Sequence, residues 1–171
     1  YVPRLRLQRK AVVEANGWFN PALAGLAKGE RSMCNWDEDS LTMAVEAARD
    51  CLGETAPSDL RALYFASTTM PFADRQNATV AATALQLGEN LRTVDMTSSQ
   101  RAGTSGLIEA LENVEGRDGQ VLYVAADTRE TAASGAQELQ MGDGAAALLL
   151  GSDNVVAEYL GSHQISTDFV D

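Results

Sequence analysis

The side chains best suited to covalent or metal chemistry are few and widely separated in this 171-residue sequence. The two cysteines, Cys34 and Cys51, have no CxxC spacing and no flanking histidines, so they indicate neither a zinc site nor a disulfide framework. Reduced thiols that pack as small hydrophobic groups are the simplest interpretation. His163 is the only histidine, so a mechanism that needs an imidazole has one candidate in this sequence.

Two further clusters invite a functional interpretation but have simpler explanations. Gly142-Asp143-Gly144 resembles a phosphate loop, yet no lysine follows it and it opens a strand pattern, which favours a tight turn. The acidic run Asp37-Glu38-Asp39 precedes a helical pattern, where carboxylates match the dipole of the helix N-terminus. We therefore predict no metal site and no bound cofactor.

The elements that must position any site follow from hydrophobic periodicity. From Asp37 onward, helical and strand patterns alternate, which is typical of an α/β layered domain with a mostly parallel sheet. No linker, repeat or low-complexity tract interrupts the pattern, so we predict one domain. The expected helices are 39–52, 77–88 and 103–114, and the expected strands are 61–67, 91–96, 120–126, 145–150 and 155–160.

Charge and hydropathy exclude several classes of partner. The 24 acidic and 13 basic residues give a net charge of −11, which repels nucleic acid phosphates and anionic membrane surfaces. No apolar run approaches the roughly 20 residues that a membrane span requires, and no signal-peptide pattern opens the sequence. We expect a cytoplasmic protein without nucleic acid or membrane partners.

Three segments carry a resemblance to a known family. Trp36–Leu52 (WDEDSLTMAVEAARDCL) resembles the first long helix of short hydroxymethylglutaryl-CoA synthases. Asp95–Leu107 (DMTSSQRAGTSGL) resembles their nucleophile turn, Asp-x-Thr-x-x-Cys-x-x-Gly-Thr, and Met141–Gly151 (MGDGAAALLLG) is similar to the glycine-rich strand of ketosynthase-like folds. The chain is thus identified as a member of the thiolase superfamily, similar to hydroxymethylglutaryl-CoA synthase and to ketoacyl-ACP synthase III.

The resemblance implies a thiolase-like fold, in which two duplicated halves each contain a five-stranded mixed sheet layered with helices. Residues 1–171 would be the N-terminal half-domain, a fragment of a longer chain. It also implies a homodimer in which the strand 91–96 pairs across a two-fold axis. The family's first strand would lie between strands 61–67 and 120–126, so we expect a gap there and an isolated chain that is unstable.

The same resemblance assigns the site, and two of its chemical groups are replaced. Gln100 occupies the position of the nucleophilic cysteine, and an amide cannot ionise or attack a thioester. Thr68 occupies the position of the glutamate general base and has no carboxylate to take a proton. Ser99 and Gly103 are the expected substrate-binding residues, and Ser98 and Ser99 are hydroxyls that lack an adjacent histidine. Gly103 and Gly106 are expected to allow close packing on the sheet.

Three functions remain open at this stage, and whether the protein is an enzyme is open with them. The first is a hydroxymethylglutaryl-CoA synthase-like condensing acyltransferase that handles acyl-CoA or acyl-carrier thioesters. The second is a decarboxylase of malonyl thioesters, in which the Gln100 amide stabilises an enolate. The third is a non-catalytic scaffold subunit that binds a thiolase or an OB-fold acyl-CoA-binding protein.

Overall fold

A mixed four-stranded sheet forms the centre of the computed structural model, which describes residues 1–53 and 60–167. The spatial order is β4-β3-β5-β6, in which β5 is parallel to β3 and antiparallel to β6, and β3 is parallel to β4. The predicted α/β class is confirmed, with four strands in the described sheet where five were expected. The strand bounds are β3 (Leu60–Ala66), β4 (Arg92–Met96), β5 (Gln120–Asp127) and β6 (Gly144–Leu150).

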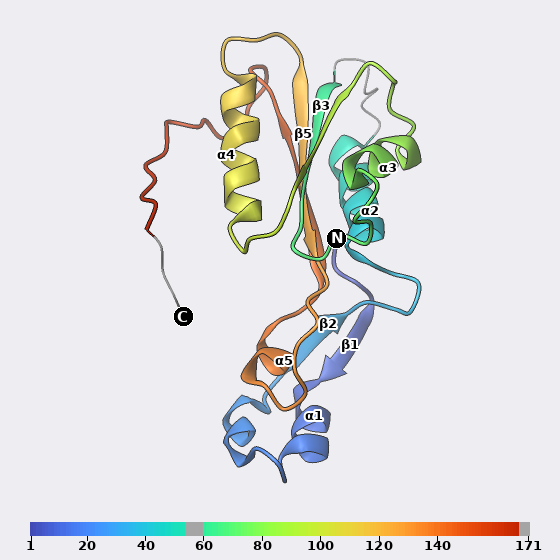
Figure 1. Ribbon diagram of the computed structural model, residues 1–171, viewed down its shortest axis with the longest axis vertical. Helices are drawn as coiled ribbons and strands as arrows, with labels where there is room; N and C mark the ends of the chain where they lie inside the picture. Colours follow the sequence, from blue (N-terminus) through green and yellow to red (C-terminus); the bar gives the residue numbers. More distant parts are fainter. Residues whose placement is uncertain (54–59, 168–171) are drawn as a thin grey trace.

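Helices cover both faces of this sheet (Figure 1). On one face, α2 (Ser40–Leu52) and α3 (Asn77–Ala84) pack over a core that contains Leu63, Phe65 and Leu122. On the other face, α4 (Ala102–Val114) packs over Tyr64 and Tyr123. The central strands are apolar on both faces because helices bury both sides of a parallel sheet.

The start of α2 shows how local sequence fixes an element. Asp39 is the N-cap: its Oδ1 accepts from the backbone N–H of Thr42 at 2.7 Å, and the Thr42 hydroxyl oxygen accepts from the Asp39 N–H at 2.7 Å. This reciprocal capping box satisfies two N–H groups that a helix leaves unpaired. Gly53, with a positive φ of 55°, follows the last residue of the helix. The acidic run before α2 is thus a helix start, as predicted.

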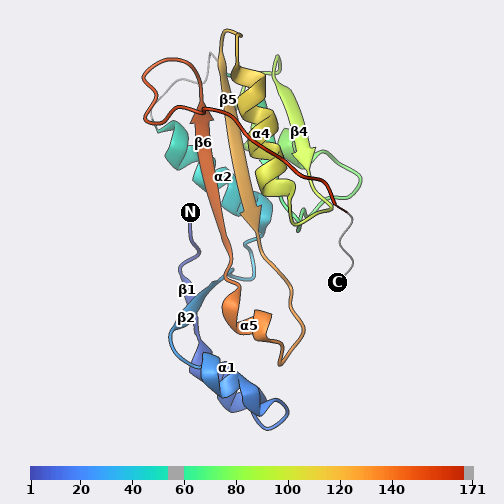
Figure 2. The ribbon, with the colours of Figure 1, turned by 90° about the vertical axis from the view of Figure 1, so that its left-hand side faces the viewer.

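Two expectations about strands are wrong. β3 and β5 pair directly, with Tyr64 opposite Tyr123, so no gap for another strand exists between them. The expected instability of the isolated chain loses its physical reason with that gap. The predicted strand at 155–160 is also absent, and this segment follows an irregular course instead (Figure 2). The side chains of Val155, Val156 and Leu160 are exposed.

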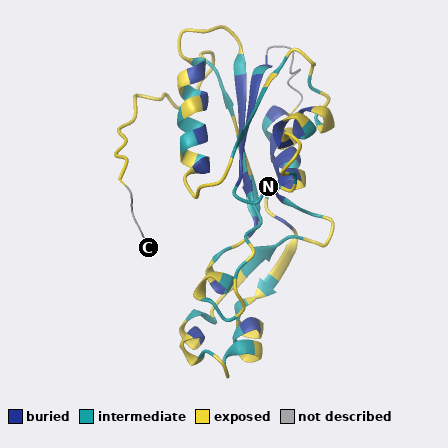
Figure 3. Cartoon of the chain, viewed as in Figure 1, coloured by how far each residue is buried: buried dark blue, intermediate teal, exposed yellow. Residues whose placement is uncertain are grey.

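A smaller lobe extends beyond the carboxyl ends of the parallel strands (Figures 1 and 3). Its small core consists of Val12, Leu23 and Leu139. The lobe joins the sheet where the hydroxyl of Ser32 donates to the carbonyl of Asp143 at 2.6 Å. None of the helices in the described residues is both long and apolar enough for a membrane span. The lobe contains β1 (Leu5–Gln8), α1 (Arg9–Asn16), the 3₁₀ helix η1 (Pro21–Leu26), β2 (Glu30–Met33) and α5 (Ala136–Gln140).

Candidate functional site

The carboxyl ends of β3, β4 and β5 lie at one edge of the sheet, and the N-terminus of α4 lies at the same edge (Figure 1). The N–H of Ser67, just beyond β3, donates to the carbonyl of Met96 at the end of β4, at 3.0 Å. In α/β sheets this edge is where loops present ligand-binding groups. The predicted site residues lie in the segments that come after these strands: Thr68 after β3, and Ser99, Gln100 and Gly103 after β4.

Gln100 lies in the turn between β4 and α4 and is exposed to solvent. Its predicted position at the N-terminus of this helix is confirmed. Ser98 in the same turn has a positive φ of 71°, a backbone conformation that residues other than glycine rarely adopt. The turn therefore changes direction sharply between strand and helix and presents Gln100 at the open end of α4.

Ser99 organises the first turn of α4. Its hydroxyl oxygen accepts from the N–H of Arg101 at 3.2 Å, and its carbonyl accepts from the N–H of Ala102 at 2.9 Å. These bonds satisfy N–H groups that a helix start leaves without intrahelical partners. Ser99 thus has a structural role here, and its role in substrate binding stays a prediction.

Asp95, which belongs to the segment that resembles the nucleophile turn, holds β4 against α3. Its Oδ2 accepts from the N–H of Asn77 at 2.7 Å, and its Oδ1 accepts from the N–H of Ala78 at 2.7 Å. A carboxylate at a helix N-terminus satisfies free N–H groups and matches the helix dipole. Both oxygens of Asp95 are used in this way, so the side chain fixes the N-terminus of α3 against β4.

The two glycines of α4 differ in how closely they approach the sheet. A Cβ on Gly106 would lie 3.2 Å from Cε2 of Tyr123 and 3.3 Å from Cγ of Met96. A Cβ on Gly103 would lie 3.8 Å from the Tyr123 hydroxyl, which is ordinary contact. Close packing is therefore confirmed at Gly106 only. The Tyr123 hydroxyl donates to the Gly103 carbonyl, and burial raises the pKa of Tyr123 to about 12.

Thr68 belongs to a dense hydrogen-bond network centred on Asp127, the last residue of β5. Oδ1 of Asp127 accepts from the Thr68 N–H at 2.7 Å and from the Thr68 hydroxyl at 2.9 Å. It also accepts from the hydroxyls of Ser67 at 3.1 Å and Thr69 at 3.2 Å. Thr69 in turn accepts from the N–H of Thr128 at 3.0 Å. The residue that we predict at the family's base position is thus bonded to a carboxylate from the neighbouring strand.

Sequence reasoning missed Asp127. The residue directly follows the third expected strand, 120–126, and no local pattern indicates that it faces Thr68. The available signal was an acidic residue directly after the apolar run Gln120–Ala126, next to a strand that ends in three hydroxyl residues, Ser67, Thr68 and Thr69. Side chains at the carboxyl ends of adjacent parallel strands meet, so the parallel pairing would have placed these groups together.

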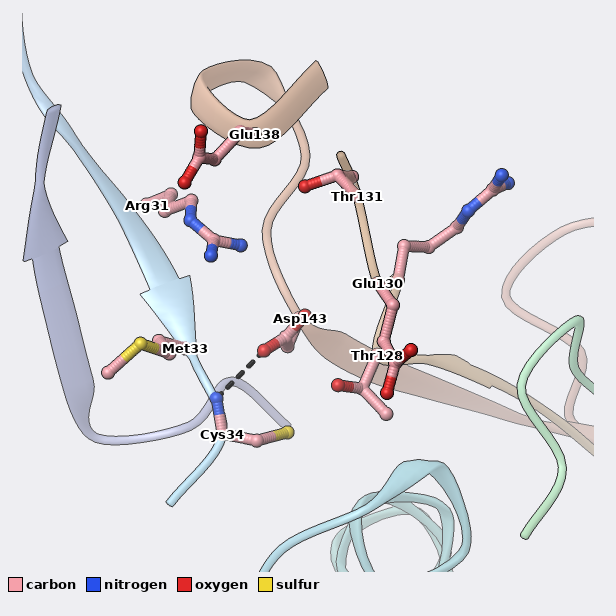
Figure 4. Close-up of a pocket in the computed structure, with 9 residues that line it drawn as sticks. Arg31, Met33, Cys34, Thr128, Glu130, Thr131, Glu138 and Asp143 are labelled. Atoms are coloured by element: carbon pink, nitrogen blue, oxygen red, sulfur yellow. Dashed lines mark hydrogen bonds between the residues drawn. The ribbon is translucent and has the colours of Figure 1, made fainter. Parts of the chain in front are cut away.

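A pocket of about 420 Å³ lies between the lobe and the segment that follows β5 (Figure 4). Arg31 extends into it, and its guanidinium donates to the carbonyl of Met141 at 3.1 Å. Cys34 also lines the pocket, and its N–H donates to Oδ2 of Asp143 at 2.8 Å. Burial raises the pKa of Cys34 to about 11. The thiol therefore stays protonated near neutral pH, which agrees with its interpretation as a packing residue.

Comparison with known proteins shows one consistent group of relatives. The chain is 33% identical over 180 residues to the hydroxymethylglutaryl-CoA synthase of Methanocaldococcus jannaschii, covering 100% of this chain and 51% of that protein. It is 31% identical over 177 residues to the hydroxymethylglutaryl-CoA synthase of Methanosphaera stadtmanae, with the same coverage. The chain spans about half the length of these relatives. No protein-family model matches the sequence.

Solved structures agree with the sequence relatives. MvaS in complex with 3-hydroxy-3-methylglutaryl coenzyme A superposes with a TM-score of 0.76 at 27% identity, covering 88% of this chain and 37% of that one. A 3-oxoacyl-(acyl-carrier-protein) synthase III superposes with a TM-score of 0.76 at 20% identity, covering 95% of this chain and 50% of that one. The second likeness shows the fold alone, and the fold is thiolase-like.

Proposed function

Because the chain is a hydroxymethylglutaryl-CoA synthase-like protein of the thiolase superfamily, matching the N-terminal half of its relatives, we propose that it binds an acyl thioester without forming an acyl-enzyme. The observation that carries this proposal is Gln100, exposed in the turn that opens α4. An amide there donates hydrogen bonds but cannot attack a carbonyl carbon.

The thioester substrate is supported by what related structures contain. One hydroxymethylglutaryl-CoA synthase with a TM-score of 0.77 is complexed with CoA, and the curacin pathway synthase is complexed with an acetyl donor carrier protein. The helix N-terminus behind Gln100 adds a favourable dipole for the partial negative charge of a carbonyl oxygen. We propose acyl-CoA or an acyl-carrier thioester as the ligand, held by Gln100 together with Ser99 and Gly103.

The test uses the complete protein and radiolabelled acetyl-CoA. We expect reversible binding in equilibrium dialysis and no label on the protein after acid precipitation. Gln100→Cys is the matched variant, and it should retain label as an acetyl-enzyme because a thiol replaces the amide at the same position. Stable label on the unmodified protein would contradict the proposal and would direct attention to Ser98 and Ser99.

Decarboxylation of a malonyl thioester is the second candidate. It is favoured by Thr68, because loss of carbon dioxide produces an enolate without a base at that position, and Gln100 would only stabilise its oxygen. Release of carbon dioxide from malonyl-CoA by the complete protein, lost in Gln100→Ala, would support it. Binding without turnover of any thioester would instead support the scaffold function, with a thiolase or OB-fold protein as partner.

The proposed homodimer would use β4, the edge strand of the described sheet. Its residues from Thr93 to Met96 are half-buried and carry one charge, so the edge has little protection against pairing with a second copy. Sedimentation should show a dimer at micromolar concentration, and a monomer would contradict this assembly.

A further inference from the structure

The outer edge of β4, which the proposed homodimer would use, is partly closed by a side chain from the start of α3. β4 lies at one end of the sheet, and among the described strands its neighbour is β3 (Figure 2). Successive carbonyl groups of a strand point alternately to its two sides. The Met96 carbonyl points toward β3, because it accepts from the Ser67 N–H at 3.0 Å. The Thr93 carbonyl, three residues earlier, therefore points to the free side.

The Gln76 side chain occupies this free side. Its Nε2 donates to the Thr93 carbonyl at 2.8 Å, and its Oε1 accepts from the Thr93 hydroxyl at 2.7 Å. Oε1 also accepts from the hydroxyl of Thr79, three residues later in α3, at 2.6 Å. The amide thus uses the carbonyl that the N–H of a further strand would need, while two hydroxyls hold the amide in place.

Gln76 is free to make these contacts because Asp95 supplies the cap of α3. Gln76 directly precedes the first residue of α3, where a side chain often accepts from the helix N–H groups, but its side chain makes no such bond. The N–H groups of Asn77 and Ala78 donate to the Asp95 carboxylate instead. The Gln76 amide therefore serves the edge of β4 and not the helix start.

The contact between α3 and the edge of β4 can open at a low energetic cost. Gln76 and Thr79 are exposed, so water can replace their hydrogen bonds when the Gln76 side chain changes its rotamer. Because protein–water bonds replace protein–protein bonds, the net contribution of such a hydrogen bond to stability is small. The closed and open arrangements are therefore close in free energy, which a reversible cover requires.

We propose that Gln76 is an autoinhibitory plug on the edge of β4, which limits the pairing of this strand with a second copy of the chain. This inference rests on the proposed homodimer. In the monomer, the Gln76 amide donates to the Thr93 carbonyl of its own chain. In the dimer, the amide moves away and this carbonyl accepts from a backbone N–H of the second copy. A symmetric dimer requires both plugs to open, so the cost of opening applies to each subunit.

Sedimentation equilibrium of the complete protein measures the dissociation constant of the dimer. Gln76→Met keeps the length of the side chain and removes its hydrogen bonds. It should lower the dissociation constant by about tenfold, because the plug of each subunit no longer has to open. Thr83→Ala is the control, since Thr83 is an exposed α3 residue whose hydroxyl donates to the Thr79 carbonyl within the helix. The control should stay within about twofold of the unmodified protein.

A second variant separates the lost hydrogen bonds from the apolar surface that methionine adds. Gln76→Ser stays polar, but its side chain is too short to reach the Thr93 carbonyl. A plug requires a tighter dimer in both variants, whereas an effect of apolar surface requires a tighter dimer in Gln76→Met alone and would overturn the proposal. Gln76 is exposed, so both variants should fold, and if one of them does not, the dissociation constant of the other decides.

The remaining outcomes distinguish the plug from the dimer on which it rests. Dissociation constants that stay unchanged or rise in both Gln76 variants would leave the dimer in place and overturn the plug. Monomers at every concentration, in the unmodified protein and in both variants, would overturn the homodimer and the plug together. A dimer that forms only in the Gln76 variants would support the plug, because the unmodified protein would then be held as a monomer by this side chain.

Discussion

The two positions at which we predict departures from the family motif differ in how the fold holds them. Thr68 is half-buried and bonded to Asp127 through backbone and side chain. Gln100 is exposed in a turn whose neighbouring residue, Ser98, has a positive φ. The threonine is thus part of the architecture at the sheet edge, whereas the glutamine is presented to solvent. The difference indicates that a change at position 68 acts on the fold and a change at position 100 acts on the ligand.

The largest expected effect comes from placing a charge at each position. Thr68→Glu should lower the free energy of unfolding by about 2–4 kcal/mol, because it removes a donor and brings a second carboxylate against Asp127. Gln100→Glu should change it by less than about 0.5 kcal/mol, since the site is exposed and a helix N-terminus tolerates negative charge. Urea denaturation at neutral pH measures both.

The pH dependence sharpens this prediction. The loss in Thr68→Glu should shrink as the pH falls, because protonation of either carboxyl group removes the repulsion and restores a donor. Thr68→Ser, which keeps the hydroxyl, is the control and should show neither the loss nor its pH dependence. Equal losses in Thr68→Glu and Gln100→Glu would contradict the contrast between the two positions.

The next effect concerns thiol reactivity at the open position. Gln100→Cys should react with iodoacetamide at least about tenfold faster than Cys34 or Cys51 at neutral pH, because a helix N-terminus lowers a thiol pKa. Burial raises the pKa of Cys51 and brings that of Cys34 to about 11. Alkylation of Cys34 should therefore keep rising with pH up to about 11, while the new thiol should reach its plateau at lower pH.

Peptide mapping of one sample compares all three thiols under identical conditions. The native cysteines serve as internal controls, because they are present in the same molecule. A new thiol that reacts no faster than Cys34 would show that the turn does not expose position 100 to solvent.

Some helices and strands could be predicted correctly from the sequence and others could not, for physical reasons. The helix after Asp39 was predictable because its capping box and its terminating Gly53 are local signals. The prediction of a strand at 155–160 was wrong, because apolar β-branched residues favour an extended backbone but do not determine whether a neighbouring strand pairs with it. Neighbours in a sheet are set by long-range pairing, so the direct contact of β3 with β5 was not predictable from either segment alone.

The candidate site shows the same contrast between local signals, which the sequence reveals, and long-range contacts, which it does not. Gln100 and Thr68 were predicted as site residues because each is assigned a fixed place in a linear motif, and their roles stay predictions. Asp127 was not found, because its importance comes from hydrogen bonds to residues about 60 positions earlier. A motif records which residue stands at a position, and it does not record which residues from distant segments contact it in the fold.

A smaller effect tests how firmly α4 seats Gln100 on the sheet. Gly103→Ala should raise the free energy of unfolding by up to about 1 kcal/mol, because alanine is the better helix former and its Cβ meets only ordinary contact. Gly106→Ala should gain less or lose stability, because its Cβ would lie 3.2 Å from Tyr123. Thermal denaturation of both variants measures the difference, and a larger gain at Gly106 would contradict the close approach of the helix.

The smallest effect tests the turn itself through two adjacent serines. Ser98→Gly should raise the free energy of unfolding by about 0.5 kcal/mol, because glycine relieves the cost of a positive φ while losing some entropy of its own. Ser99→Gly should lower it by about 0.5–1 kcal/mol, since the Ser99 hydroxyl oxygen accepts from the Arg101 N–H. Opposite signs at these two neighbouring exposed residues would reflect the positive φ of Ser98 on one side and the hydroxyl hydrogen bond of Ser99 on the other. Losses of equal size in both variants would show that Ser98 carries no strain, and the turn would then present Gln100 less rigidly than the fold indicates.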